Sequence, residues 1–141
     1  MLKNDTFTLG SFALSELLLM NDANYPWLIL VPRVEDIIEI VDLSPKDQEQ
    51  LLAEINMLSK LLRSEYSPDK LNIAALGNMV SQLHIHCVAR FKHDAAWPKP
   101  IWGVHPAQAY STQELEATAR NLVAKVEAAG LLDFTSRRSY S

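Results

Sequence analysis

The stretch that decides the fold lies in the middle of the chain and reads Ser81-Gln82-Leu83-His84-Ile85-His86-Cys87-Val88-Ala89-Arg90-Phe91. Polar and apolar residues alternate in it, which is the period of a half-buried β-strand. Successive strand side chains point to opposite faces, so the pattern predicts Gln82, His84 and His86 on one face. The opposite face, directed into the core, would hold Leu83, Ile85 and Cys87. Two imidazoles and an amide would therefore share one rigid surface.

Two long amphipathic helices are predicted outside this strand. The first runs from Pro45 to Tyr66, because Ser44 is a good N-cap, proline suits the first helical position, and leucines recur at helical spacing. The second begins after Ser111, which forms a capping box with Glu114, and runs to about Ala129. Gly130 then supplies the residue that ends it.

Short apolar segments predict four further strands, at residues 6–9, 12–20, 27–31 and 71–76. The first would be a short edge strand. The last is joined to the histidine strand by a short connection, which implies an antiparallel hairpin. The expected fold class is therefore α+β, with a mainly antiparallel sheet of about five strands and two principal helices. We expect a single domain over residues 1–141, with a core at 6–110 and a C-terminal helix and tail at 111–141.

Composition bears on the partners and the location of the protein. The chain has 141 residues, a net charge of −4 and one cysteine. A mildly acidic chain has no long-range attraction for DNA or RNA, so a nucleic-acid polymer is not expected as a partner. A single cysteine allows no internal disulfide and suits a reducing compartment. The N-terminus does not read as a signal peptide and no apolar run is long enough to span a membrane, so we expect a cytoplasmic protein.

The paired histidines allow several interpretations. Neutral imidazole is a good nucleophile toward phosphorus, and His84 could attack if its other nitrogen were held as a donor by a backbone carbonyl. His86 could then donate a hydrogen bond to a phosphate oxygen. His-x-His on a strand can also bind zinc if a further ligand such as His93 or His105 lies nearby. A third interpretation is that two surface histidines occur there by chance.

The residues around the two histidines resemble the signature of the histidine-triad (HIT) family. In that signature, a Gly-x-x-Val-x lead-in precedes three histidines that alternate with apolar residues. The segment from Gly77 to Val88 matches it, with Gln82, His84 and His86 at the three alternating positions. The resemblance extends upstream to Leu17–Asn21, to Trp27–Arg33, and to Asp42–Pro45 at the start of the first helix. It covers roughly residues 12–91. The Trp97–Gly103 segment resembles a bacterial branch of hydrolase-like members.

The resemblance implies hydrolysis or transfer at the α-phosphate of a nucleotide through a nucleotidyl-histidine intermediate. By position, His84 would be the nucleophile and His86 the partner of a phosphate oxygen. The first triad position is Gln82, whose backbone carbonyl could still orient His84, although the side chain cannot move a proton. Asn21 and Asn78 match family residues that contact ribose or phosphate. Arg90 shares the parity of the histidines and is expected to reach phosphate from the same face.

The implied substrate is a small nucleotide, of the dinucleoside polyphosphate or nucleoside phosphoramidate type. No cofactor or metal bound by the protein is expected, although magnesium could accompany a polyphosphate. The family also implies a homodimer, which is the commonest oligomer in general. Two alternatives stay open: a nucleotide-binding or regulatory module with little turnover, and a metal-dependent hydrolase that uses His-x-His. Trp97 and Trp102 are expected to pack against the domain rather than cover a base or a neighbouring subunit.

Overall fold

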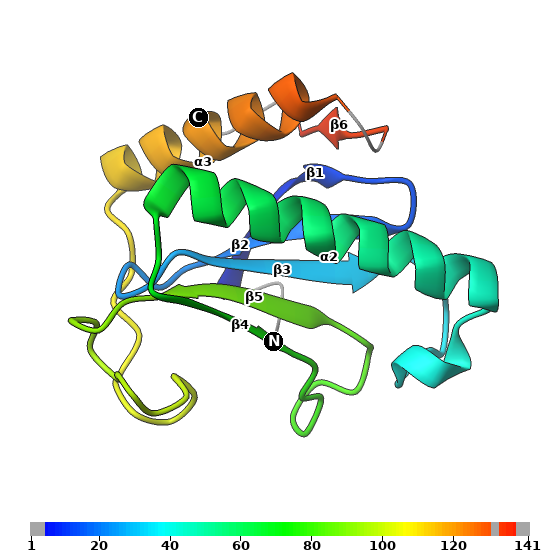
Figure 1. Cartoon of the computed structure of the whole chain (residues 1–141), viewed down its shortest axis with the longest axis horizontal. Helices are drawn as coiled ribbons and strands as arrows, with labels where there is room; N and C mark the ends of the chain where they lie inside the picture. The colour runs from blue at the N-terminus through cyan, green and yellow to red at the C-terminus, as the bar shows by residue number, and fades with distance from the viewer. Residues whose placement is uncertain (1–4, 131–132, 138–141) are drawn as a thin grey trace.

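The computed structural model describes residues 5–130 and 133–137. Within them, six strands form one antiparallel sheet in the order β4-β5-β3-β2-β1-β6 (Figure 1). In chain order the strands are β1 (Thr6–Ser11), β2 (Ser15–Met20), β3 (Trp27–Pro32), β4 (Lys70–Ala74), β5 (Ile85–Arg90) and β6 (Thr135–Ser136). The α+β class and the antiparallel sheet are confirmed.

Both predicted helices are confirmed at their predicted ends. The first, α2 (Pro45–Tyr66), begins with the Ser44 side chain accepting the backbone N–H of Asp47. The second, α3 (Thr112–Ala129), begins with the predicted capping box and ends at Gly130, whose φ of +64° suits glycine. A short 3-10 helix, η1 (Ile40–Asp42), precedes α2.

The first two strands differ from the prediction at their ends. Residues 12–14 form the turn between β1 and β2, in which the backbone N–H of Phe12 donates a hydrogen bond to the carbonyl of Ser15 (2.8 Å). Strand β1 is not an edge strand, because β6 pairs with it at Gly10 and Ser11. The two-residue β6 has no periodicity from which it could be predicted.

The histidine strand also begins later than predicted. Its ladder starts at Ile85, because the backbone N–H of Leu83 donates to the carbonyl of Ile37 (2.9 Å), outside the sheet. Strands β4 and β5 are antiparallel neighbours as expected. However, residues 75–84 join them in a longer loop than a tight hairpin. This loop becomes one wall of the cavity described below.

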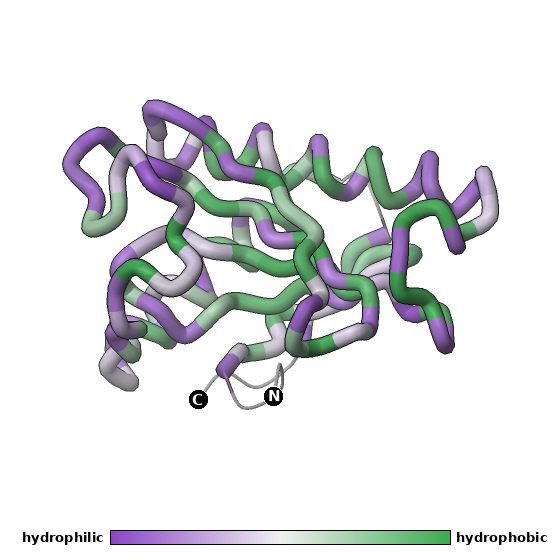
Figure 2. Tube along the Cα trace, turned by 90° about the horizontal axis from the view of Figure 1, so that it is seen from below, coloured by the Kyte–Doolittle hydropathy of each residue, from purple (hydrophilic) through white to green (hydrophobic). Residues whose placement is uncertain are grey.

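The sheet has a different cover on each face. On one face, α2 and α3 lie side by side and share a core with the strands, for example Leu58 and Leu122 with Leu28 and Ile85 (Figure 1). In Figure 2 the strands are largely hydrophobic, whereas the helical turns alternate between hydrophobic and hydrophilic residues, as expected for helices that bury one side. None of the helices in the described parts of the chain is long and apolar enough to cross a membrane.

The opposite face is covered by irregular chain. There Trp27, Ile29 and Val88 pack with Ala96 and Ile101, which belong to the segment between β5 and α3. Strand alternation places Ile85 and Cys87 toward the helices and leaves the histidines on this second face. The fold therefore separates its main core from the surface on which the histidines lie.

Candidate functional site

His84 and His86 lie side by side at the wall of one cavity. Their ring centroids are 5.0 Å apart in an edge-to-face arrangement, and the side chains are only 7% and 5% exposed. The cavity in front of them has a volume of about 670 Å³. It is lined by Asp5, Met20, Trp27, Leu76, Gly77, Asn78, Met79, Val80, His84, His86 and Trp102. The predicted pairing of the two rings on one face is confirmed.

The backbone fixes the protonation pattern of His84. Its Nδ1 lies 2.7 Å from the carbonyl oxygen of Gln82. A carbonyl only accepts, so Nδ1 carries the proton and Nε2 of the neutral ring keeps its lone pair. This is the arrangement that an attacking imidazole requires, and the predicted carbonyl provides it.

A hydrogen bond from Trp27 fixes which ring nitrogen of His86 carries the proton. The indole Nε1–H of Trp27 donates to His86 Nδ1 at 3.0 Å. An indole nitrogen is only a donor, so in the neutral ring the proton of His86 is on Nε2. Burial, together with the neighbouring His84, lowers the pKa of His86 from 6.5 to about 4. His86 is therefore a neutral donor at pH 7.

We expect this shift in the pKa of His86 to make the fold sensitive to acid. The pKa is about 4 in the folded state and 6.5 in the ordinary, unfolded state, so between these values the unfolded chain binds more protons. The associated stability is fully present above pH 6.5 and is lost as the pH falls through about 4, which amounts to roughly 3 kcal/mol. Urea unfolding at a series of pH values measures this loss. The His86→Gln variant should show a flatter profile, and equal slopes for both proteins would contradict the assignment.

The side chain of Gln82 does not contact the histidines. Its Nε2 donates to the carbonyls of Pro32 and Val34, both at 3.3 Å, and so holds the segment that follows β3. The amide is not among the groups that line the cavity. Gln82 thus contacts His84 through its backbone carbonyl and not through its side chain.

This arrangement predicts that Gln82→Ala leaves the orientation of His84 intact, because alanine keeps the carbonyl. We expect turnover to fall by less than about tenfold, since the change removes only two long amide hydrogen bonds. Steady-state rates of the variant measure this. Gln82→His should not raise the rate above that of Gln82→Ala if the side chain at this position points away from the substrate. A loss of several orders of magnitude in Gln82→Ala would show instead that the amide takes part in the reaction.

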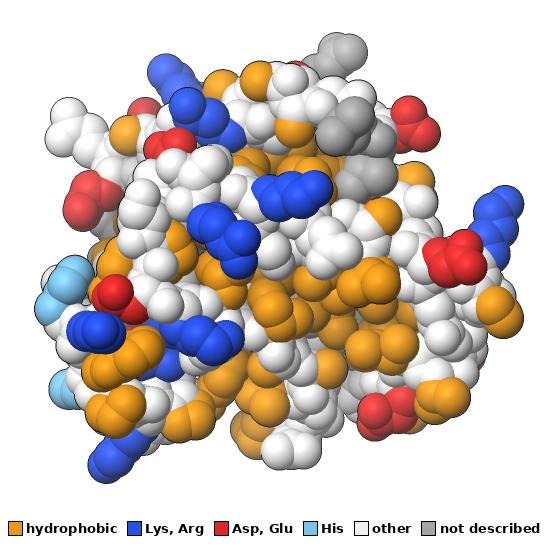
Figure 3. Space-filling view, viewed as in Figure 1, with side chains coloured by type: hydrophobic (Ala, Val, Ile, Leu, Met, Phe, Trp, Pro, Cys, Tyr) orange, Lys and Arg blue, Asp and Glu red, His pale blue; other side chains and the backbone are white. Residues whose placement is uncertain are grey.

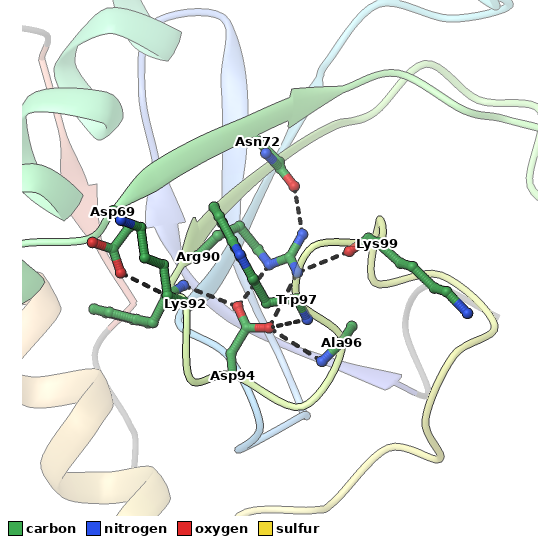
Figure 4. A network of polar contacts seen from close by, with 9 residues as sticks. Asp69, Asn72, Arg90, Lys92, Asp94, Ala96, Trp97 and Lys99 are labelled. Atoms are coloured by element: carbon green, nitrogen blue, oxygen red, sulfur yellow. Dashed lines mark hydrogen bonds and ion pairs between the residues drawn. The ribbon is translucent and has the colours of Figure 1, made fainter.

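The prediction that Arg90 reaches a phosphate is corrected by the structure. Arg90 is 2% exposed, and its guanidinium is held by the Asp94 carboxylate, the Asn72 side chain and the Lys99 carbonyl (Figure 4). Arg90 does point to the same face of the sheet as the histidines, as its position in the strand predicted. However, it stays within this network and is absent from the residues that line the cavity. A guanidinium can satisfy several acceptors at once, which suits it to anchoring a loop.

Asp94 completes this network from the loop side. Its carboxylate accepts from Arg90 and from the backbone N–H groups of Phe91, Ala96 and Trp97 (Figure 4). Burial alone would raise the pKa of Asp94, but these hydrogen bonds lower it from 3.8 to about 2. The guanidinium of Arg90 also lies over the Trp97 ring. The network fixes the start of the segment that carries Trp102 to the site.

The two predicted asparagines lie at different places. Asn78 lines the main cavity, next to Gly77, whose φ of +84° lets the loop turn along the wall. Asn21 lines an adjoining cavity of about 430 Å³, and its Oδ1 accepts the backbone N–H of Tyr110 (2.9 Å). The two cavities share four residues: Asp5, Met20, Trp27 and Trp102. The structure thus brings Asn78 to the histidines and places Asn21 on the neighbouring side.

Several residues at the site were not predicted from the sequence. Trp27 was interpreted only as part of a buried strand, yet it lines the cavity and bonds to His86. Its strand parity, combined with the pairing of β3 with β5, was the signal that could have found it. Trp102 packs edge-on against both Trp27 and His86, so it contacts the domain and the cavity at once. Trp97 packs against Arg90, as expected of domain packing.

The donor set does not favour a metal site. Among residues 5–130 and 133–137, no three His, Cys, Asp or Glu side chains are grouped so that they could hold a metal. Both Nδ1 atoms are engaged, and His86 Nε2 carries a proton, whereas a ligating nitrogen needs a lone pair. Cys87 lies in the core, as predicted, where burial raises the pKa of its thiol to about 12.

The antiparallel sheet, its two helices and the histidine pair at a cavity define an α+β protein with a histidine-lined site. A model of the HIT domain matches residues 2–93, and the chain belongs to this family of histidine-triad proteins. No curated protein matches the chain.

Three crystal structures of bacterial histidine-triad proteins are similar over most of their length. The protein from Bradyrhizobium japonicum is 49% identical with a TM-score of 0.86, and the match covers 89% of this chain and 93% of that one. The protein from Marinobacter aquaeolei VT8 is 43% identical, with a TM-score of 0.87 and coverages of 90% and 93%. The protein from Sinorhizobium meliloti 1021 is 40% identical, with a TM-score of 0.85 and coverages of 88% and 92%. The family supports a role in nucleotide binding, hydrolysis or transfer.

Proposed function

We propose that the protein is a nucleotide hydrolase or transferase that acts at the α-phosphate through a covalent intermediate on His84. The observation that carries this proposal is the bond from His84 Nδ1–H to the carbonyl of Gln82, beside a cavity that His86 also lines. This bond leaves His84 with a lone pair on Nε2, and the bond from Trp27 leaves His86 with an N–H on its own Nε2, so that a nucleophile and a donor lie 5.0 Å apart between ring centroids.

The proposed reaction has two displacements at phosphorus. In the first, the lone pair of His84 Nε2 forms a bond to the α-phosphorus, and the bond to the leaving group breaks with its electron pair. In the second, water attacks phosphorus, the P–N bond returns its electrons to Nε2, and nucleoside monophosphate is released. The proton that the water gives up passes to solvent, because the leaving group has already departed in the first step. An acceptor other than water would give transfer in place of hydrolysis.

His86 would stabilise the charge that develops on the phosphoryl oxygens. A neutral Nε2–H held in place before the reaction costs no reorganisation when the charge appears. Gln82 offers no proton to the leaving group, because its amide is bonded to the carbonyls of Pro32 and Val34. The leaving group would therefore take its proton from solvent.

The cavity suits a nucleotide in shape and chemistry. Its wall is mainly apolar, with Trp102, Leu76 and Met79 available to contact a base, and Asn78 lies beside the histidines. We propose that Asn78 contacts the phosphate and Asn21 the ribose or a phosphate from the adjoining cavity. Dinucleoside polyphosphates and nucleoside phosphoramidates are the substrate types to test, and magnesium would enter only with the former.

A rapid-quench experiment tests the proposal. Nucleotides labelled at the α-phosphate are mixed with the enzyme, quenched in alkali, where a P–N bond survives, and analysed for a nucleotidyl adduct on His84. The adduct should form and decay at rates compatible with turnover. Turnover without an adduct on any histidine would overturn the covalent mechanism.

A second candidate is a nucleotide-binding module with little turnover. The observation that favours it is the Gln82 side chain, which leaves the first triad position without a group that can protonate the leaving group. Tight binding of AMP with no hydrolysis of any nucleotide in the panel would support this module and count against the enzyme.

We also propose that two copies associate through the face at the β4 end of the sheet. Strand β4 is the terminal strand, and Ile73 in it is about half exposed, as is Leu52 on α2. Figure 3 shows hydrophobic side chains gathered on the face that carries α2. Exposed apolar patches of this kind mark interaction sites. Sedimentation equilibrium should give twice the chain mass, and Ile73→Lys should shift the protein toward the monomer; a monomeric wild type would overturn this proposal.

A further inference from the structure

Trp27 reaches the site from the strand next to the histidines. Strands β3 and β5 are paired so that Trp27 lies opposite Val88, and His86 is two residues from Val88 on the same face. This diagonal relation places the indole within reach of the imidazole. The resulting Nε1–H···Nδ1 bond of 3.0 Å is buried, with Trp27 only 8% exposed.

The chemistry of this bond distinguishes the charge states of His86. An imidazolium carries a proton on both nitrogens, so its Nδ1–H would face the indole N–H, and neither can accept. Protonation of His86 therefore requires the bond to break. The alternative neutral tautomer, with its proton on Nδ1, is excluded in the same way.

We infer that Trp27 is a positioning residue that holds His86 as a neutral ring with its Nε2–H directed at the phosphate. This inference rests on the proposed function for the role of the donor, but the tautomer itself can be measured without substrate. Trp27 does not need to touch the reacting atoms for this role.

The groups around His86 do not supply the same constraint. His84, which precedes β5, faces it, and Asp5, which precedes β1, lines the same cavity. Asp22 and His105 line the adjoining cavity, while β4 contributes Ala74, which pairs with His86 in the ladder. A charged His84 would oppose protonation of His86, whereas the Asp5 carboxylate would favour protonation of His86. Neither group determines which nitrogen of the neutral ring carries the proton. Only the indole bond does so among these contacts.

Trp102 offers a matched control within the same cavity. Its ring contacts His86 at 5.2 Å between centroids, much as Trp27 does at 5.6 Å. However, Nε1 of Trp102 is buried without a hydrogen-bond partner in the structure. Trp27→Phe therefore removes an aromatic neighbour and a hydrogen bond to His86, whereas Trp102→Phe removes a similar neighbour and no such bond.

The decisive experiment is long-range ¹H–¹⁵N NMR of the full chain labelled at its histidines, without substrate. In the wild type we expect His86 to show a bare Nδ1 and a protonated Nε2 that persist from about pH 8 to about pH 5.5. Trp27→Phe should redistribute the proton between the two nitrogens and raise the pH at which the ring titrates. Trp102→Phe should keep the wild-type tautomer.

A wild-type spectrum with the proton on Nδ1 would overturn the inference, even if Trp27→Phe did not fold. An unchanged His86 pattern in a folded Trp27→Phe would do the same.

Kinetics then connect the tautomer to turnover. We expect kcat of Trp27→Phe to fall roughly 3- to 10-fold, the effect of one hydrogen bond, with a steeper loss toward acid pH. If Trp27 acts through His86, adding Trp27→Phe to His86→Gln should lower the rate no further. Additive losses would overturn the positioning role. Turnover that survives in His84→Ala would instead refute the proposed function, while the NMR result would still stand.

Discussion

Replacing His84 with alanine is expected to reduce turnover by at least about 10⁴-fold, because it removes the atom that forms the proposed covalent intermediate. The loss should appear in kcat and kcat/KM together, since the lost interaction exists only once phosphorus is attacked. Initial rates with a nucleoside phosphoramidate, compared with the uncatalysed rate, measure this effect. The P–N adduct should disappear from the same variant.

The control for this change is His93→Ala. His93 lies seven residues after His86 in the irregular segment, is exposed, and stacks only on the Phe91 ring. Its removal should leave turnover within about twofold, because a surface substitution away from the site changes little. Circular dichroism establishes that both variants are folded. If folded His84→Ala retains a tenth or more of the wild-type rate, the nucleophile must be another group.

The second large effect is expected in stability. Asp94→Ala should lower the free energy of unfolding by about 3–5 kcal/mol, because it leaves the buried charge of Arg90 without its counter-ion. It also removes the acceptor for three backbone N–H groups of the loop. Chemical denaturation measures the difference. Since the same loop leads to Trp102 at the cavity wall, KM for the nucleotide should rise as well.

An exposed ion pair provides the comparison for Asp94→Ala. Lys125 and Glu65 are 3.7 Å apart, with side-chain exposures of 55% and 24%. Lys125→Ala should change the free energy of unfolding by less than about 1 kcal/mol, as is usual for surface pairs. A similar small change in Asp94→Ala would show that the Arg90 network contributes little to the fold.

Much of the fold could be predicted because its signals are local. The ends of α2 and α3 follow from Ser44, Ser111 and Gly130, which act on the adjacent turn alone. The alternation around His84 and His86 likewise predicts the face that they share. Even the orienting carbonyl of Gln82 follows from a two-residue separation along the chain.

What could not be predicted depends on contacts between distant residues. The bond from Trp27 to His86 joins residues 59 apart, and the Gln82 side chain meets carbonyls about 50 residues away. Arg90 has the right parity for the site, but its acceptors come from β4 and from the irregular segment after β5. Strand period gives the face of a side chain and not its partner. The register between strands supplies the missing information.

The place of β5 in the sheet has a consequence for how activity can be lost. It lies between β3 and β4 and is hydrogen-bonded to both. Amide protons in such a strand exchange with solvent only when a large part of the molecule opens, so His86, which lies within the strand, cannot fray out of alignment by itself. Substitutions that only destabilise the fold will therefore lower the number of folded molecules, while the position of His86 in the molecules that remain folded stays unchanged.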